Sequence, residues 1–80
     1  MAHTAVLSFE YDSPERTHRV ERAISPERGD IDDDRSRASL CRTGRILEVS
    51  IEARDVVALR AALNTWFSLV TVAERAGDVV

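Results

Sequence analysis

Residues 46–76 read ILEVSIEARDVVALRAALNTWFSLVTVAERA, and this stretch decides the fold because a strand runs directly into a long helix. From residue 45 to residue 53, apolar and polar residues alternate, which is typical of a strand with one buried face. Asp55 is a favourable N-cap, and apolar residues then recur at helical spacing up to about residue 76. Gly77 is placed to end this helix.

A second strand, residues 36–42, is predicted to pair with the strand at 45–53 through a turn at Thr43 and Gly44. With a two-residue turn, the expected pairs are Arg42 with Arg45, Leu40 with Leu47, Ala38 with Val49, and Ser36 with Ile51. This register gathers the apolar residues of both strands on one face, which supports the hairpin.

The N-terminal part of the chain predicts another strand and a first helix. Residues 5–11 alternate between apolar and polar. Ser13 can cap a helix that has Pro14 at its first position, and Pro26 disfavours helical geometry beyond Ser25. Residues 26–34 then form an acidic loop. The residues expected on the inner side of the helix are Thr17, Val20, Ala23 and Ile24.

The element order is therefore strand, helix, strand, strand, helix, within a single domain that covers residues 1–80. The simplest arrangement is an α+β two-layer sandwich. In it, a three-stranded antiparallel sheet carries both helices on one face.

The final helix is apolar over a wider arc than its own core requires. Its central stripe includes Leu63 and Trp66, and the whole apolar arc spans about 160°, whereas a helix that covers a sheet needs about 100°. Two alternatives are open for Phe67, near the edge of the arc. It packs against the first helix, or it is left exposed with Leu69 and Val72 and marks a binding site.

Composition limits the possible cellular setting. Cys41 is the only cysteine, which excludes a disulfide within the chain and fits a reducing cytoplasm. All eleven basic residues are Arg, against fourteen acids and a net charge of −3. This usage suggests a GC-rich genome and a salt-loving source. The chain has no signal-peptide pattern and no apolar run of membrane-span length, so we expect a cytoplasmic protein without a membrane partner.

The sequence predicts no catalytic residues, metal site or cofactor. Acids at residues 30–34 resemble the start of a calcium loop, but Arg35 stands where glycine is required and Cys41 where glutamate is required. His3, His18 and Cys41 lack the spacing of metal ligands. No glycine-rich phosphate-binding motif is present. We therefore expect a protein that is not an enzyme.

A strip of arginines keeps a different function open. Arg16, Arg19, Arg22 and Arg28 could contact phosphates, although Glu15, Glu21 and Glu27 balance them and the net charge is negative. The alternative function is a small RNA-binding α+β module. The sequence lacks the GxxG loop and the aromatic sheet face that common RNA-binding folds use.

The last helix also carries a resemblance to a known family. Its residues fit a Leu-Arg-Ala-x-x-Asn-Ser/Thr pattern, at Leu59, Arg60, Ala61, Asn64 and Thr65. With the element order, Pro26-Glu27 after the first helix and the run at 47–53, the chain resembles the small dimeric subunit of the KEOPS complex (the CTAG/Pcc family) over nearly its whole length. It departs from the family at Thr65, where serine is usual, and in a longer, more acidic loop before the second strand.

The resemblance implies a non-catalytic role, in an archaeal complex. KEOPS installs the threonylcarbamoyl group on the adenosine next to the anticodon of tRNAs, and its catalytic subunit is a metal-binding, ATPase-like transferase. The small subunit dimerises and packs its helices against those of the transferase, so that the dimer bridges two transferases. We therefore predict a homodimer that also binds the transferase, and leave open a contact with tRNA through Arg16 or Arg19. The predicted partner interface consists of Val20, Ile24, Arg60, Leu63, Asn64, Phe67, Leu69 and Val70.

Overall fold

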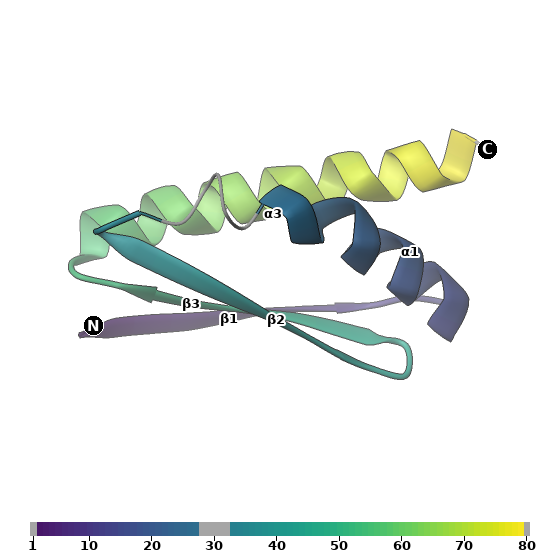
Figure 1. Ribbon diagram of the computed structural model, residues 1–80, viewed down its shortest axis with the longest axis horizontal. Helices are drawn as coiled ribbons and strands as arrows, with labels where there is room; N and C mark the ends of the chain where they lie inside the picture. The colour runs from purple at the N-terminus through teal and green to yellow at the C-terminus, as the bar shows by residue number, and fades with distance from the viewer. Residues whose placement is uncertain (1, 28–32, 80) are drawn as a thin grey trace.

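The computed structural model describes residues 2–27 and 33–79, with side chains up to residue 76. The described elements are β1 (His3–Glu10), α1 (Pro14–Ile24), the 3-10 turn η1 (Ser25–Glu27), β2 (Ser36–Thr43), β3 (Ile46–Ala53) and α3 (Val56–Val79). The strands form an antiparallel sheet in the order β1-β3-β2. Both helices lie on one face of this sheet (Figure 1), which confirms the predicted α+β two-layer sandwich.

The strands keep the predicted inner and outer faces. Along β1, half-buried and exposed residues alternate over the whole length, with Leu7 and Phe9 packed against the core and Val6 exposed. On β3 the apolar residues Leu47 and Val49 are buried. The outer face of the sheet carries the residues of opposite parity, as a period of two requires.

The hairpin between β2 and β3 differs from its predicted register by two residues. Leu40 lies opposite Val49, and the turn is made by Gly44 and Arg45 instead of Thr43 and Gly44. Gly44 has a φ of 59°, and no other described residue has a positive φ. A positive φ at the first turn position alone is the pattern of a type II′ hairpin, which favours glycine there. The predicted register was wrong, but the faces survive because an even shift keeps each side chain on its side.

Helix α1 begins as the sequence predicts. The Ser13 Oγ accepts a hydrogen bond from the Arg16 backbone N–H at 3.1 Å, and Pro14 occupies the first turn. Val20 and Ile24 lie on the inner side of α1 and are buried in the core, whereas Ala23 is exposed. The prediction of an inward Ala23 was wrong because one residue turns a helix by about 100° and carries Ala23 off the stripe that Ile24 occupies.

Helix α3 supplies the centre of the core. Trp66 and Val70 are fully buried between the sheet and α1. Asp55 caps the helix, since its Oδ1 accepts a hydrogen bond from the Ala58 backbone N–H at 2.7 Å. The helix continues through Gly77 to Val79. The predicted end at Gly77 was therefore wrong, because a glycine costs a helix about 1 kcal/mol and does not have to stop it.

Candidate interaction surface

Helix α3 is apolar on more sides than the one that packs on the sheet. Between Asp55 and Glu74, Arg60 is the only charged residue. The stretch Val56–Ala76 is long and apolar enough, by length and composition, to cross a membrane, with a mean hydropathy of 1.5. The expectation that no stretch reaches that length was therefore wrong. A helix that packs on a sheet as part of a protein core can have the same length and composition. In this chain the buried side chain of Trp66 packs α3 on the sheet.

The excess apolar character lies on the surface. Val57 is 71% exposed, Val72 is 61% exposed and Phe67 is 55% exposed. Phe67 thus follows the second of the two predicted alternatives and is left exposed. Leu69 is only half-buried and packs against the edge of the core. Large apolar side chains exposed along one helix indicate a surface that binds another molecule.

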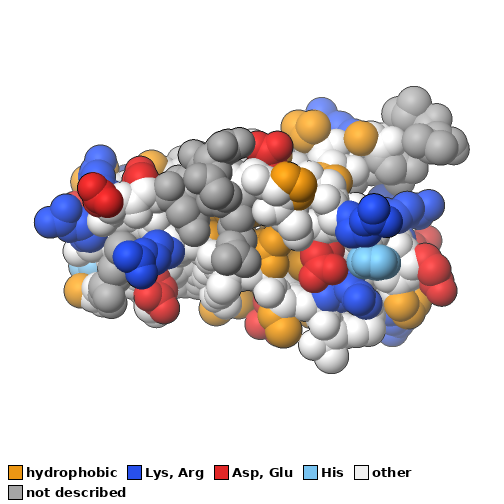
Figure 2. Space-filling view, viewed as in Figure 1, with side chains coloured by type: hydrophobic (Ala, Val, Ile, Leu, Met, Phe, Trp, Pro, Cys, Tyr) orange, Lys and Arg blue, Asp and Glu red, His pale blue; other side chains and the backbone are white. Residues whose placement is uncertain are grey.

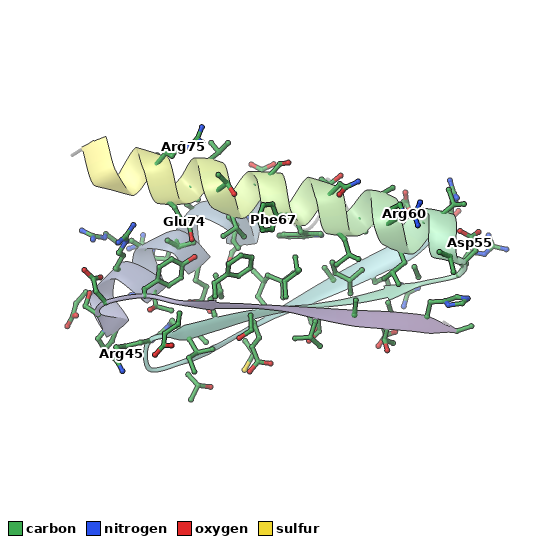
Figure 3. The ribbon with its side chains drawn as sticks, turned by 180° about the vertical axis from the view of Figure 1, so that it is seen from behind. Arg45, Asp55, Arg60, Phe67, Glu74 and Arg75 are labelled. Carbon is green, nitrogen blue, oxygen red and sulfur yellow. The ribbon has the colours of Figure 1, made fainter. Side chains whose placement is uncertain are left out.

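One side of α3 faces the edge strand β1. The ring centroid of Phe67 lies 6.3 Å from that of Phe9, with the two rings tilted by 41°. Arg60, Phe67 and Glu74 follow one another along the helix (Figure 3), whereas Arg75 points away from the sheet. This side therefore combines an exposed aromatic ring with charges of opposite sign before and after it.

The other side of α3 is hollowed where the helix passes η1. We call this open depression of about 640 Å³ the outer groove; its lining residues are Glu27, Asn64, Thr65, Ser68, Leu69 and Val72. A second depression of about 330 Å³ continues toward the start of the helix and is lined by Val56, Val57, Arg60, Ala61 and Asn64. Asn64 lines both depressions, and the second also includes Arg60, so at the start of the helix it borders the β1 side described above.

Eight residues were predicted at the partner interface, and the structure divides them. Three lie in the core of the chain itself, namely Val20, Ile24 and Val70, with exposures of 3%, 0% and 0%. They contribute no surface, and we remove them from the interface. Helical spacing alone could not distinguish these core residues from interface residues. A helix that packs on a sheet with one side and binds a partner with another carries apolar residues on both sides. Five remain on or near the surface: Arg60, Leu63, Asn64, Phe67 and Leu69.

A polar cluster at the end of β1 was not predicted. The Tyr11 hydroxyl is buried and makes no hydrogen bond of ordinary geometry within the described part of the chain. Burial raises the pKa of Tyr11 strongly, and the nearby carboxylate of Glu74 raises it further. The Arg16 guanidinium lies 5.6 Å from the centre of the Tyr11 ring. Tyr11 and Glu74 are 63 positions apart in the sequence, so no local pattern could have predicted that they lie close together.

The arginine strip of α1 is not a uniform basic surface. Arg16 lies 3.9 Å from Asp12, and Arg42 reaches from β2 to Glu21 at 3.2 Å. Basic and acidic side chains lie interspersed at the end of the molecule where α1 lies (Figure 2). Arg28 lies outside the described residues, as do Asp30 and Asp32 of the acidic loop.

Residues suited to metal binding do not come together in the parts that the structure describes. No group of three or more His, Cys, Asp or Glu side chains there could hold a metal ion. His18 is exposed on α1, and Cys41 is exposed on the outer sheet face. The surface of α3 is therefore the feature on which a function can be argued.

The fold and this surface define a class, the small two-layer α+β domain with an exposed apolar helix face. Comparison with protein families places the chain within it: the chain belongs to the family described as "Transcription factor Pcc1", which matches residues 4–78. Comparison with curated proteins gives no match.

The fold is also similar to a solved one. A chain of the structure described as "Crystal structure of binary complex Gon7-Pcc1" superposes with a TM-score of 0.86. The match covers 98% of this chain and 95% of that one, at 15% sequence identity. At this identity the likeness shows the fold alone.

Proposed function

We propose that this chain is a non-catalytic, dimerising subunit of an archaeal KEOPS complex. In this role it docks the catalytic threonylcarbamoyl transferase in the cytoplasm, bridges two copies of it, and so supports threonylcarbamoyladenosine modification of tRNA. Membership of the Pcc1 family supports the assignment of this chain to the KEOPS complex. The Arg-only basic composition and the excess of acids support a salt-loving source.

The observation that carries the proposal is the lack of charge on the exposed sides of α3. A solvent-facing helix surface normally bears charged residues, and depletion of charge marks the core of a protein interface. Over the residues between Asp55 and Glu74, Arg60 is the only charge, while Val57, Phe67 and Val72 are exposed. Two exposed sides, the β1 side and the outer groove, offer room for a second copy and for the transferase.

The outer groove is suited to a helix of the transferase. Its floor and walls are built from small or short side chains, including Thr65 and Ser68, with Leu69 and Val72 as apolar contacts. Short side chains let a second helix approach closely and insert larger residues between them. The helix-on-helix contact that the family resemblance implies is therefore compatible with this surface.

The direct test is size-exclusion chromatography with light scattering, on the protein alone and with the transferase of the same source. We expect a dimer at micromolar concentration and a larger complex in the mixture. A Val72→Glu variant should lose the complex and keep the dimer, because Val72 lines the outer groove. A monomer that forms no complex with the transferase would refute the proposal.

The RNA-binding alternative makes a different prediction. An RNA-binding module would bind tRNA alone, with an affinity that falls steeply as salt rises. The net charge of −3 argues against this, and equally against direct DNA contact of the kind that the family description suggests. Contact with tRNA through Arg16 or Arg19, inside the complex, would appear only when the transferase is present.

A further inference from the structure

Strand β2 forms the edge of the sheet that lies away from β1. Among the residues that the structure describes, the only strand that pairs with β2 is β3. Because the hairpin turn has two residues, every second residue of β2, counted back from Thr43, is hydrogen-bonded to β3. The hydrogen bond from the Arg54 N–H to the Arg35 carbonyl, at 2.9 Å, follows the same parity. The N–H and C=O groups of Leu40 and Arg42 therefore point away from the sheet.

The two halves of β2 differ in what covers their backbone. At the start of the strand, the Ser36 carbonyl accepts a hydrogen bond from the Asp33 N–H at 3.0 Å, and the Asp33 carboxylate accepts one from the Ser36 N–H at 2.9 Å. At the other end lie Leu40, which is half-buried against the core, and the exposed residues Cys41 and Arg42. We call residues 40–43 the β2 edge. An unpaired edge of this kind is a template for an added strand.

The surroundings of the β2 edge are basic, although the chain as a whole is acidic. Residues 35–47 contain four arginines and no acid, whereas the whole chain has fourteen acids and eleven basic residues. The Arg42 Nε donates a hydrogen bond to Glu21 at 3.2 Å, which leaves its two Nη groups for a second carboxylate. Arg37 makes no ion pair with any residue that the structure describes. An incoming strand with negative charge is therefore favoured.

This combination of backbone and charge distinguishes between the possible occupants. Two β2 edges face to face would bring together the arginines of both copies with no acid between them, which like-charge repulsion opposes. A nucleic acid could use the charges, but it cannot continue a ladder of backbone hydrogen bonds. An extended acidic peptide can use both.

We infer that the β2 edge binds an extended acidic segment of another protein by strand addition, with a carboxylate of the segment on Arg42 and an apolar side chain on Leu40. The two contacts come from residues two apart in the segment, because such residues share one face of a strand. Backbone hydrogen bonds then supply affinity and the two side chains supply specificity. The inference goes beyond the proposed docking of the transferase on α3 and does not depend on it.

A pair of short peptides tests the inference on the full chain. The probe is Thr-Glu-Thr-Val-Thr with both ends blocked, and its partner probe has Gln in place of Glu. In an NMR titration at low ionic strength, we expect the Glu peptide to bind about tenfold more tightly, since a charge-assisted hydrogen bond is lost in the other. The amide protons of Leu40 and Arg42 should shift downfield as they gain hydrogen bonds. That of Cys41, already bonded to β3, should shift little.

Substitution of the arginine completes the test. Arg42→Gln should weaken the Glu peptide about tenfold and leave the Gln peptide unchanged, which is the pattern of two groups that contact each other. Arg45→Gln is the matched control, because it removes the same charge at the same hairpin. Arg45 pairs with Glu10 of β1 at 3.5 Å, on the other side of β3. Its affinity for both peptides should therefore match that of the wild type.

Three outcomes would overturn the inference. One is the absence of shifts at Leu40 and Arg42 with millimolar Glu peptide. Another is equal weakening by Arg42→Gln and Arg45→Gln, which would indicate attraction without a specific contact. The third is an RNA oligonucleotide that displaces the peptide and binds more tightly, which would make the edge a nucleic-acid contact. The comparison of the two peptides uses the unaltered protein, so it holds even if Arg42→Gln disturbs the fold.

Discussion

The ring of Phe67 packs on the ring of Phe9 at 6.3 Å, although more than half of Phe67 remains exposed. The contact fixes the side chain against β1 without burying it. An aromatic ring held in place in this way loses little conformational entropy when a partner covers it, which suits it to an interface.

Replacing Phe67 should therefore affect binding more than folding. We expect Phe67→Asp to weaken partner association about tenfold or more, because it places a charge in an apolar contact. Stability should fall by about 1 kcal/mol, since the side chain is only partly buried. Light scattering and thermal unfolding measure the two effects. Trp66→Ala is the contrasting control, with an expected loss of about 3–5 kcal/mol at a fully buried site. Unfolding of the Phe67→Asp chain would place Phe67 in the core.

Tyr11 should resist ionisation in the folded protein. It is the only tyrosine in the chain, so phenolate absorbance reports on this residue alone. Burial, followed by the carboxylate of Glu74, raises its pKa well above the ordinary value. We expect no phenolate signal until the protein unfolds.

The same shift predicts a loss of stability in alkali. The unfolded chain ionises near pH 10 while the folded chain does not, so stability should fall as pH rises above about 10. Tyr11→Phe should remove this dependence, and it should be neutral or stabilise by about 1 kcal/mol because it deletes a buried hydroxyl that makes no hydrogen bond to the residues the structure describes. Phenolate absorbance near pH 10 in a folded sample would contradict the buried environment.

The N-cap residue Asp55 predicts that the stability of the folded protein falls at acidic pH. The hydrogen bond from the Ala58 backbone N–H, aided by the charge of Arg35, lowers the pKa of Asp55. Because the folded-state pKa is the lower one, the stabilisation is present above the ordinary pKa, about 4, and is lost as pH falls through the folded value. We expect Asp55→Asn, which caps without ionising, to flatten this part of the curve of melting temperature against pH. An unchanged curve would mean that Asp55 does not contribute.

Gly44 should be required in the turn because of its positive φ, and not because a larger side chain would lack space. A Cβ at Gly44 would have nothing within 4 Å, yet the φ of 59° is unfavourable for other residues. We expect Gly44→Ala to cost about 1–2 kcal/mol in chemical denaturation. Arg45→Ala, at the next turn position, should cost far less, because its ion pair with Glu10 is exposed. Equal effects of the two substitutions would argue against the type II′ turn.

Sequence patterns predicted the faces of the elements better than their pairing. The alternation in β1 and β3 identified the inward-facing residues correctly, because which face a side chain lies on depends on parity alone. The register of β2 was missed by two residues, since both registers give the same apolar face and the choice depends on the glycine φ at Gly44.

The candidate surface was predicted in part. The excess apolar arc of α3 could be expected from helical spacing, whereas the exposure of Phe67 was one of two alternatives that the spacing left open. The burial of Val20, Ile24 and Val70 could not, because it depends on how closely α1 and α3 meet over the sheet. The contact between Glu74 and Tyr11 joins distant parts of the chain and has no local signal.

The place of β3 in the sheet has a consequence for how the protein is made. β3 comes last of the strands in the sequence but lies between the other two. Neither β1 nor β2 has a neighbour until β3 arrives, so a nascent chain that ends before Ile46 holds strands without a sheet. Folding on the ribosome should therefore start late and complete in one step, with protease resistance gained only after β3 has emerged.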